Sequence, residues 1–301
     1  MAEVQVPSQA TYWVIPGHVL FLVLPLLGLA WFSYMMARRM TPLLRGAPDP
    51  RFNHLPLRFV RILKFWLGQW KQPRYLAAGV LHIVIFAGFL VLSIRSVSLV
   101  LLGMSQHFEG LTGALGHFYN LTKDDAATFV LLAVVIAAIR RAVLKPSRYA
   151  VPARYGKDHT AEALLILGLI GTLMVSESLC EASSAAFGAA AGQMAEAPAP
   201  LSLAWMMKSA LLSSSPAALT TVHLGAYLIH ELTFFTFLCV LPVGKHFHVV
   251  TSFFNVYFSK LDRRGTVKPV RWGVADEQLN QVKSFGVKQF EEFTWKQMLD
   301  F

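Results

Sequence analysis

Long apolar runs with few charged residues recur along this chain, separated by shorter polar segments. They lie at residues 16–36, 76–94, 126–139 with an extension outward through Asp125, 163–176 continuing to Cys180, and 216–244, which Glu231 interrupts. A helix needs about 20 mainly apolar residues to cross a bilayer. Within the bilayer a helix satisfies all of its own backbone hydrogen bonds. The pattern therefore predicts an all-α integral membrane bundle of five transmembrane helices.

The segments outside these runs differ in what they predict. Residues 55–72 carry apolar residues at helical spacing with basic residues and two tryptophans between them, which is typical of an amphipathic helix at a membrane surface. Residues 181–200 are rich in Ala, Gly and Ser and indicate a flexible connector. Residues 261–301 are charged and too short for a core of their own, so we expect this tail to lead to, or dock on, a further domain or another subunit. The chain is thus divided into a membrane domain, 1–260, and a cytoplasmic tail, 261–301.

The distribution of charge adds an orientation. Charged residues make up 15% of the chain and the formal net charge is +10. Lys and Arg gather at 38–74, at 140–157 and after residue 245. The positive-inside rule then predicts an outer N-terminus and a cytoplasmic C-terminus in a bacterial cytoplasmic membrane. This placement indicates membrane lipid rather than nucleic acid as the partner. The first run lacks the basic segment of a signal peptide, so we expect a retained helix.

Histidines inside the predicted spans are the most informative polar residues. His82 lies in the second span, His223 and His230 lie in the fifth, and His248 closes the fifth span at its cytoplasmic end. At about 100° per residue, these three positions of the fifth span share one face, whereas His246 points elsewhere. Histidines from two facing helices are the usual ligands of b-type haem. A single membrane histidine can instead bond a neighbouring carbonyl, and that reading stays open.

The surroundings of these histidines fit a porphyrin. Gly79 and Gly88 flank His82 and predict a flat surface for the ring, while Arg74 and Lys245 are placed to pair with propionates. The chain has no C-x-x-C-H motif, which excludes covalent c-type attachment. Its two cysteines cannot supply the four thiolates of an ordinary iron–sulfur cluster.

The segment HELTFFTFLCVLPVGKHFHVVTS resembles the fifth helix of the respiratory nitrate reductase gamma subunit, a five-helix protein with two b haems. The spacing of His230, Pro242 and His248 matches that helix. GVLHIVIFAGF resembles the second helix of the same fold, in which His82 is the inner ligand. The resemblance implies an inner haem between His82 and His248. At the position of the second helix's other ligand this chain has Leu92, so the outer haem needs a different partner among His223, His230 and His18.

Three further segments, LHIVIFAGF, RRAVLKPSR and FGVKQFEEFTWKQML, together resemble membrane-bound, heterodisulfide-reductase-like iron–sulfur oxidoreductases. This group includes electron-transfer flavoprotein:menaquinone oxidoreductases. In that family the last motif is followed by cysteine-rich ferredoxin-type segments. The resemblance therefore implies iron–sulfur clusters in an adjoining domain or subunit.

A quinone site needs a hydrogen-bonding or protonatable group at depth. Arg95, Glu177 and Glu231 are the candidates; we expect Arg95 and Glu177 to form an ion pair and Glu231 to serve as the proton acceptor. The resulting hypothesis is a subunit with one or two b haems that links a cytoplasmic iron–sulfur module and electron-transfer flavoprotein to menaquinone. The alternatives are a menaquinol-oxidising subunit that feeds a sulfur-metabolism reductase, and a haem-free membrane anchor.

Overall fold

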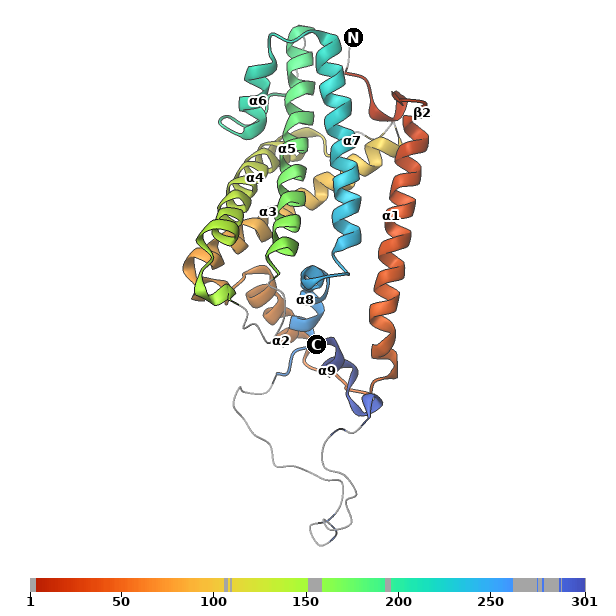
Figure 1. Cartoon of the computed structure of the whole chain (residues 1–301), viewed down its shortest axis with the longest axis vertical. Helices are drawn as coiled ribbons and strands as arrows, with labels where there is room; N and C mark the ends of the chain where they lie inside the picture. The colour runs from red at the N-terminus through yellow and green to blue at the C-terminus, as the bar shows by residue number, and fades with distance from the viewer. Residues whose placement is uncertain are drawn as a thin grey trace. The chain divides into compact units, whose positions relative to one another are not determined.

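The structure is a computed structural model, shown in Figure 1, and it describes residues 4–105, 108, 110–150, 159–192, 196–261, 275, 278, 287 and 289–300. Much of the tail predicted at 261–301 and part of the basic segment 140–157 lie outside the described residues. The chain forms two compact units, Met1–Phe32 with Gln72–Val240, and Ser33–Lys71 with Leu241–Phe301. We call them the helical unit and the second unit, and each is described by itself.

Five helices of the described chain are long and apolar enough to cross a membrane. They are α1 (Gly17–Met40), α3 (Leu76–Met104), α4 (Gly113–Ile139), α5 (Thr160–Ala190) and α7 (Pro216–Val240). Their outward surfaces are apolar, with exposed residues such as Leu26, Val80 and Ile136. A large continuous apolar surface of this kind is typical of a protein in contact with lipid. The all-α, five-helix prediction is confirmed, and the protein is a membrane protein by this criterion.

The helical unit also contains shorter elements. They are the 3-10 helix η1 (Pro7–Gln9), an antiparallel hairpin of β1 (Thr11–Tyr12) and β2 (Ile15–Pro16), η4 (Gln72–Arg74), the π-helix η5 (Arg140–Leu144), η6 (Ser147–Tyr149) and α6 (Leu203–Leu211). Helix α5 contacts α4, α6 and α7 and is the centre of the packing (Figure 1). The helices approach closely where α5 has small residues, and these alanines, Ala182, Ala185 and Ala186, are almost fully buried.

Several predicted boundaries were wrong. Helix α4 begins at Gly113, earlier than the predicted extension of the 126–139 run through Asp125 requires, and it includes Lys123 and Asp124. Helix α5 continues to Ala190, so the first half of the predicted flexible connector 181–200 is helical. The connector prediction failed because Ala-rich segments also have high helix propensity.

The predicted continuous run 216–244 is also wrong. Helix α7 ends at Val240, and after a turn the chain forms η8 (Lys245–Phe247) and α8 (His248–Tyr257). Pro242 lies in this turn, where it supplies no backbone N–H to continue the helix. The angular argument that carried His248 onto the face of His230 assumed one continuous helix, and it does not apply.

The second unit contains η2 (Thr41–Arg45), α2 (Leu55–Arg61), the π-helix η3 (Ile62–Leu67), η8, α8, η10 (Phe290–Glu292) and α9 (Trp295–Leu299). The predicted amphipathic helix 55–72 therefore ends at Leu67. Its Arg58 is 2% exposed and donates to the carbonyl of Tyr257 at 2.7 Å, so this cation holds α8 instead of facing water.

The described end of the tail docks on its own chain. The amide of Ala47 donates to the carbonyl of Phe293 at 2.8 Å, and the amide of Trp295 donates to the carbonyl of Ala47 at 3.2 Å. The indole of Trp295 donates to the carbonyl of Asp49 at 3.1 Å. For the described residues 289–300 these contacts lie within the second unit, and docking of the tail on a further domain or subunit stays a prediction.

Candidate functional site

Helix α5 carries two polar stripes in its C-terminal half. Ser176, Cys180 and Ser183 recur at helical spacing and face one way, while Glu177 and Glu181 lie about 100° further round the helix. The first stripe contacts α7, and the second contacts α3 and α4 through the bonds described below. One helix thereby organises both sets of buried polar groups in the helical unit.

The first stripe fixes the two histidines of α7. Nδ1 of His223 lies 3.2 Å from the carbonyl oxygen of Cys180 and 3.5 Å from Oγ of Ser183. A carbonyl can only accept, so Nδ1 of His223 carries the proton. Nε2 of the same ring is then unprotonated and has a lone pair available for a metal.

His230 is held in the same way about two turns further along α7. Its Nδ1 lies 3.3 Å from Oγ of Ser176, and that hydroxyl donates to the carbonyl of Thr172 at 2.7 Å. Because the hydroxyl proton is already used, Nδ1 of His230 is the donor to Ser176. His230 is 2% exposed, and its Nε2 has no hydrogen-bond partner in the described part of the chain.

This arrangement fits a haem ligand. A metal-bound histidine usually donates its other ring N–H to a fixed acceptor, which sets the tautomer and orients the ring. Burying a polar atom without a hydrogen-bond partner costs about 1–3 kcal/mol, so a buried nitrogen lone pair without a partner indicates a ligand-binding group. Nε2 of His230 is such a buried lone pair. His223 has the same tautomer, with the proton on Nδ1 and the lone pair on Nε2.

The depth of each histidine limits which of them can share an iron. The hydroxyl of Tyr227 donates to the carbonyl of Leu99 at 2.6 Å, and α3 and α7 run in opposite directions (Figure 1). His230 is about 5 Å along α7 from this contact, whereas His82 is about 25 Å along α3 in the same direction. The two rings are thus separated by about 20 Å along the bundle, too far to bind one metal atom.

His18 has the opposite relation to α7. The ring of Phe21 lies edge-on to Tyr227 with centroids 4.8 Å apart, and α1 and α7 run in the same direction. His18 precedes Phe21 by three residues and His223 precedes Tyr227 by four, so the helical rise puts both histidines at nearly the same depth. His18 is exposed at the start of α1.

The other predicted haem-site residues are placed as follows. His82 is half-buried on α3, and Arg74 is exposed in η4. Gly88 packs against the side chain of Val130, and Gly79 packs under the carbonyl of Gln72, so both glycines allow close protein packing. Leu92 is buried in an apolar cluster with α4 and α5.

His248 and Lys245 belong to the second unit. His248 is the first residue of α8 and is exposed. Its Nδ1 lies 3.0 Å from the carbonyl of Lys245, an acceptor, so this ring also carries its proton on Nδ1. The described residues contain no group of three His, Cys, Asp or Glu side chains that could hold a metal ion. Haem iron needs two axial side chains.

The second stripe of α5 builds a buried charge network. The guanidinium of Arg95 lies 2.8 Å from Glu177 and 2.6 Å from Glu181, which confirms the predicted Arg95–Glu177 ion pair. Lys123 is 1% exposed and lies 2.9 Å from Asp124 and 3.3 Å from Glu181. Each carboxylate of the network therefore has a cationic partner, as buried charges require.

The network also positions the segment before α6. The second oxygen of Asp124 accepts from the amide of Ala199 at 3.0 Å. One turn further along α4, Oγ1 of Thr128 accepts from the amide of Leu203 at 2.9 Å. Lys123, Asp124 and Glu181 were missed as site residues, although the spacing of Glu177 and Glu181 by four residues in an apolar helix was a visible signal.

Glu231, the predicted proton acceptor, is 1% exposed on α7 beside His230. Its Oε1 has no hydrogen-bond partner among the described residues. Within the described part of the chain Glu231 therefore has no hydrogen bond or ion pair to the charge network, although it lies in the same unit.

Comparison with known proteins gives two distant relatives. The probable iron–sulfur-binding oxidoreductase FadF of Bacillus subtilis is 23% identical over 294 residues, which is 96% of this chain and 38% of that protein. The EtfAB:quinone oxidoreductase of Syntrophomonas wolfei is 24% identical over 251 residues, which is 80% of this chain and 32% of that protein. The chain thus spans less than two-fifths of the length of either relative.

No protein-family model matches the chain, and no solved structure matches it. Both relatives are oxidoreductases by name, which supports an oxidoreductase-related role for this membrane chain.

Proposed function

We propose that this chain is a haem b membrane subunit that passes electrons between a cytoplasmic iron–sulfur module and the menaquinone pool of a bacterial cytoplasmic membrane. The observation that carries the proposal is the state of the α7 histidines. Both donate through Nδ1 to α5, and Nε2 of His230 is buried without a partner in the described chain. Buried polar side-chain atoms without a specific role usually have a hydrogen-bond partner.

His223, with His18 at the same depth, is the pair that fits an outer haem; His230 is the alternative ligand on α7. The inner haem would use His82 and His248, as the resemblance implies, with Arg74 and Lys245 toward its propionates. A bound haem b supplies one-electron transfer at each site. The chain contributes the ligands, their tautomers and the exclusion of water.

The relatives' names support the partners. One is named for a quinone and for EtfAB, and the other for iron–sulfur binding. We therefore assign menaquinone as substrate and an electron-transfer flavoprotein, acting through iron–sulfur clusters outside this chain, as the electron donor. In this proposal Glu231 would accept the proton of a quinol hydroxyl, which its buried Oε1 without a hydrogen-bond partner in the described chain supports.

The proposal is tested with a reduced-minus-oxidised spectrum of the purified chain in a lipid nanodisc. We expect a b-type α-band that menadione reoxidises, and a smaller band in His82→Ala and in His248→Ala. His117→Ala is the control, because that ring is mostly exposed and pairs with Glu196 at 2.6 Å. A wild-type protein without the band would make the chain a haem-free anchor, and an undiminished band in both variants would reject the inner ligands.

A further inference from the structure

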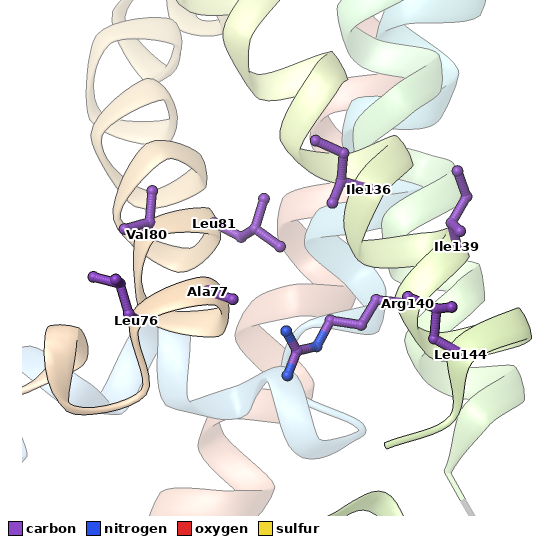
Figure 2. A pocket seen from close by; sticks show the side chains of 8 residues that line it. All are labelled: Leu76, Ala77, Val80, Leu81, Ile136, Ile139, Arg140 and Leu144. Atoms are coloured by element: carbon purple, nitrogen blue, oxygen red, sulfur yellow. The ribbon is translucent and has the colours of Figure 1, made fainter.

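An apolar groove lies between α3 and α4, away from the α7 histidines. It has a volume of about 620 Å³ and is lined by the first turns of α3 and the last turns of α4, as Figure 2 shows. Leu76 and Val80 form one wall, and Ile136 and Ile139 form the other. These four side chains are between 46% and 70% exposed, so the groove opens to the surroundings of the bundle.

Arg140 is the one charged residue of this lining. Its side chain extends from α4 into the space between the two helices (Figure 2). Its Nε is buried and has no hydrogen-bond partner in the described part of the chain. An arginine in an apolar groove with an unused donor is ready for an anionic ligand.

The backbone explains why Arg140 points into the groove. From Arg140 onward α4 continues as the π-helix η5, and the amide of Lys145 bonds to the carbonyl of Arg140 at 3.1 Å. Such a wider turn changes the angular position of each side chain. Nε of the neighbouring Arg141 also lacks a hydrogen-bond partner in the described chain, but Arg141 lies outside the groove lining, with its guanidinium 4.5 Å from the ring centroid of Tyr149.

We propose that this groove binds an anionic phospholipid, with the phosphate on Arg140 and an acyl chain between Val80 and Ile136. One cationic group at one end of an otherwise apolar lining complements a molecule with one anionic end and a long apolar chain. A quinone ring has carbonyls on opposite sides and needs polar partners at both. The groove lining has a polar side chain, Arg140, at one end and apolar side chains elsewhere, so it suits a quinone less well.

The test uses native mass spectrometry of the full chain titrated with phosphatidylglycerol or with phosphatidylcholine of the same acyl chains. We expect the wild type to retain phosphatidylglycerol preferentially. Arg140→Gln should lower its affinity by about tenfold and leave phosphatidylcholine unchanged, because it removes a charge-assisted contact. Ala77→Trp, which fills the groove, should reduce retention of both lipids.

Arg141→Gln is the matched control and should bind like the wild type. Each variant is first checked for an unchanged elution volume and circular dichroism, so that loss of binding is separated from loss of fold. Equal affinity for the two lipids in the wild type, or unchanged phosphatidylglycerol binding in Arg140→Gln, would overturn the proposal. Displacement of the lipid by menadione at the same site would overturn it in favour of a quinone site.

Discussion

The two polar stripes of α5 lie side by side in the same bundle and are satisfied to different degrees. Glu177 and Glu181 meet Arg95 and Lys123 within ion-pair distance. His223 and His230 meet α5 through Nδ1, and Nε2 of His230 has no partner in the described chain. Oε2 of Glu177 also lacks a hydrogen-bond partner among the described residues, so the two stripes differ in charge pairing: Glu177 and Glu181 each have a cationic partner, whereas Nε2 of His230 has no partner in the described chain.

The largest effect is expected in the charge network. Arg95→Leu leaves Glu177 and Glu181 with less compensation in a buried position, so the free energy of unfolding should fall by about 3–5 kcal/mol. Chemical unfolding in detergent micelles, followed by circular dichroism, measures this change. The double variant Arg95→Leu/Glu177→Leu should recover part of the loss. Wild-type stability in Arg95→Leu would show that the network does not hold the bundle.

The bond between α5 and His230 should affect ligand affinity more than stability. Ser176→Ala removes the acceptor that fixes Nδ1 of His230, so haem affinity should fall by about 10–100-fold. Haem transfer to apomyoglobin gives the affinity. Ser178→Ala is the matched control. Ser178 is also buried on α5, but it lies about 200° round the helix from Ser176 and outside the stripe that contacts the histidines. Equal affinities in the two variants would remove Ser176 from the haem site.

In haem-depleted protein the histidine itself should matter little. His230→Leu removes a buried nitrogen that lacks a partner, so its unfolding free energy should stay within about 1 kcal/mol of the wild type or exceed it. A thermal melt of haem-depleted protein checks this. A loss as large as that of Arg95→Leu would place His230 with the structural groups and break the contrast between the stripes.

The smallest effect is expected in the second unit, where charges lie near its surface. The hydrogen bond from Arg51 lowers the pKa of Asp49, and Thr294 donates to the same carboxylate at 3.1 Å. A lowered folded pKa means that the stabilisation is present above the unfolded value of about 3.9 and is lost as the pH falls further.

We therefore expect the tail helix α9 to loosen below about pH 4, seen as a change in Trp295 fluorescence. The other tryptophans are replaced by phenylalanine for this measurement. Asp49→Asn should show the loosened signal already at neutral pH, because the amide cannot keep the charge-assisted bonds to Arg51. A pH-independent signal in both proteins would contradict the docking role of Asp49.

The sequence predicted the five helices because their apolar centres are long and free of charge. It predicted the Arg95–Glu177 pair because both residues stand out in apolar runs. Lys123 and Asp124 were missed as site residues because hydropathy marks the apolar part of a span, and α4 begins more than three turns before Ala126, where that part starts. A paired charge inside a bundle has the same hydropathy as one in a loop, so its burial depends on tertiary contacts.

The histidine sites show the same limit. The sequence identified His223 and His230 as neighbours on one face. It could not supply their tautomers, because these depend on where the α5 hydroxyl and carbonyl groups lie. Pro242 indicated a kink in the fifth span, but the end of the helix at Val240 was not predicted because the surrounding residues remain apolar.

The most direct test is the haem-to-protein ratio of the purified chain by pyridine haemochrome, in wild type, His223→Ala/His230→Ala and His117→Ala. We predict a b-type haem in the wild type, loss of the outer haem in the α7 double variant, and an unchanged ratio in His117→Ala. The same ratio in all three proteins would contradict haem binding by the α7 histidines.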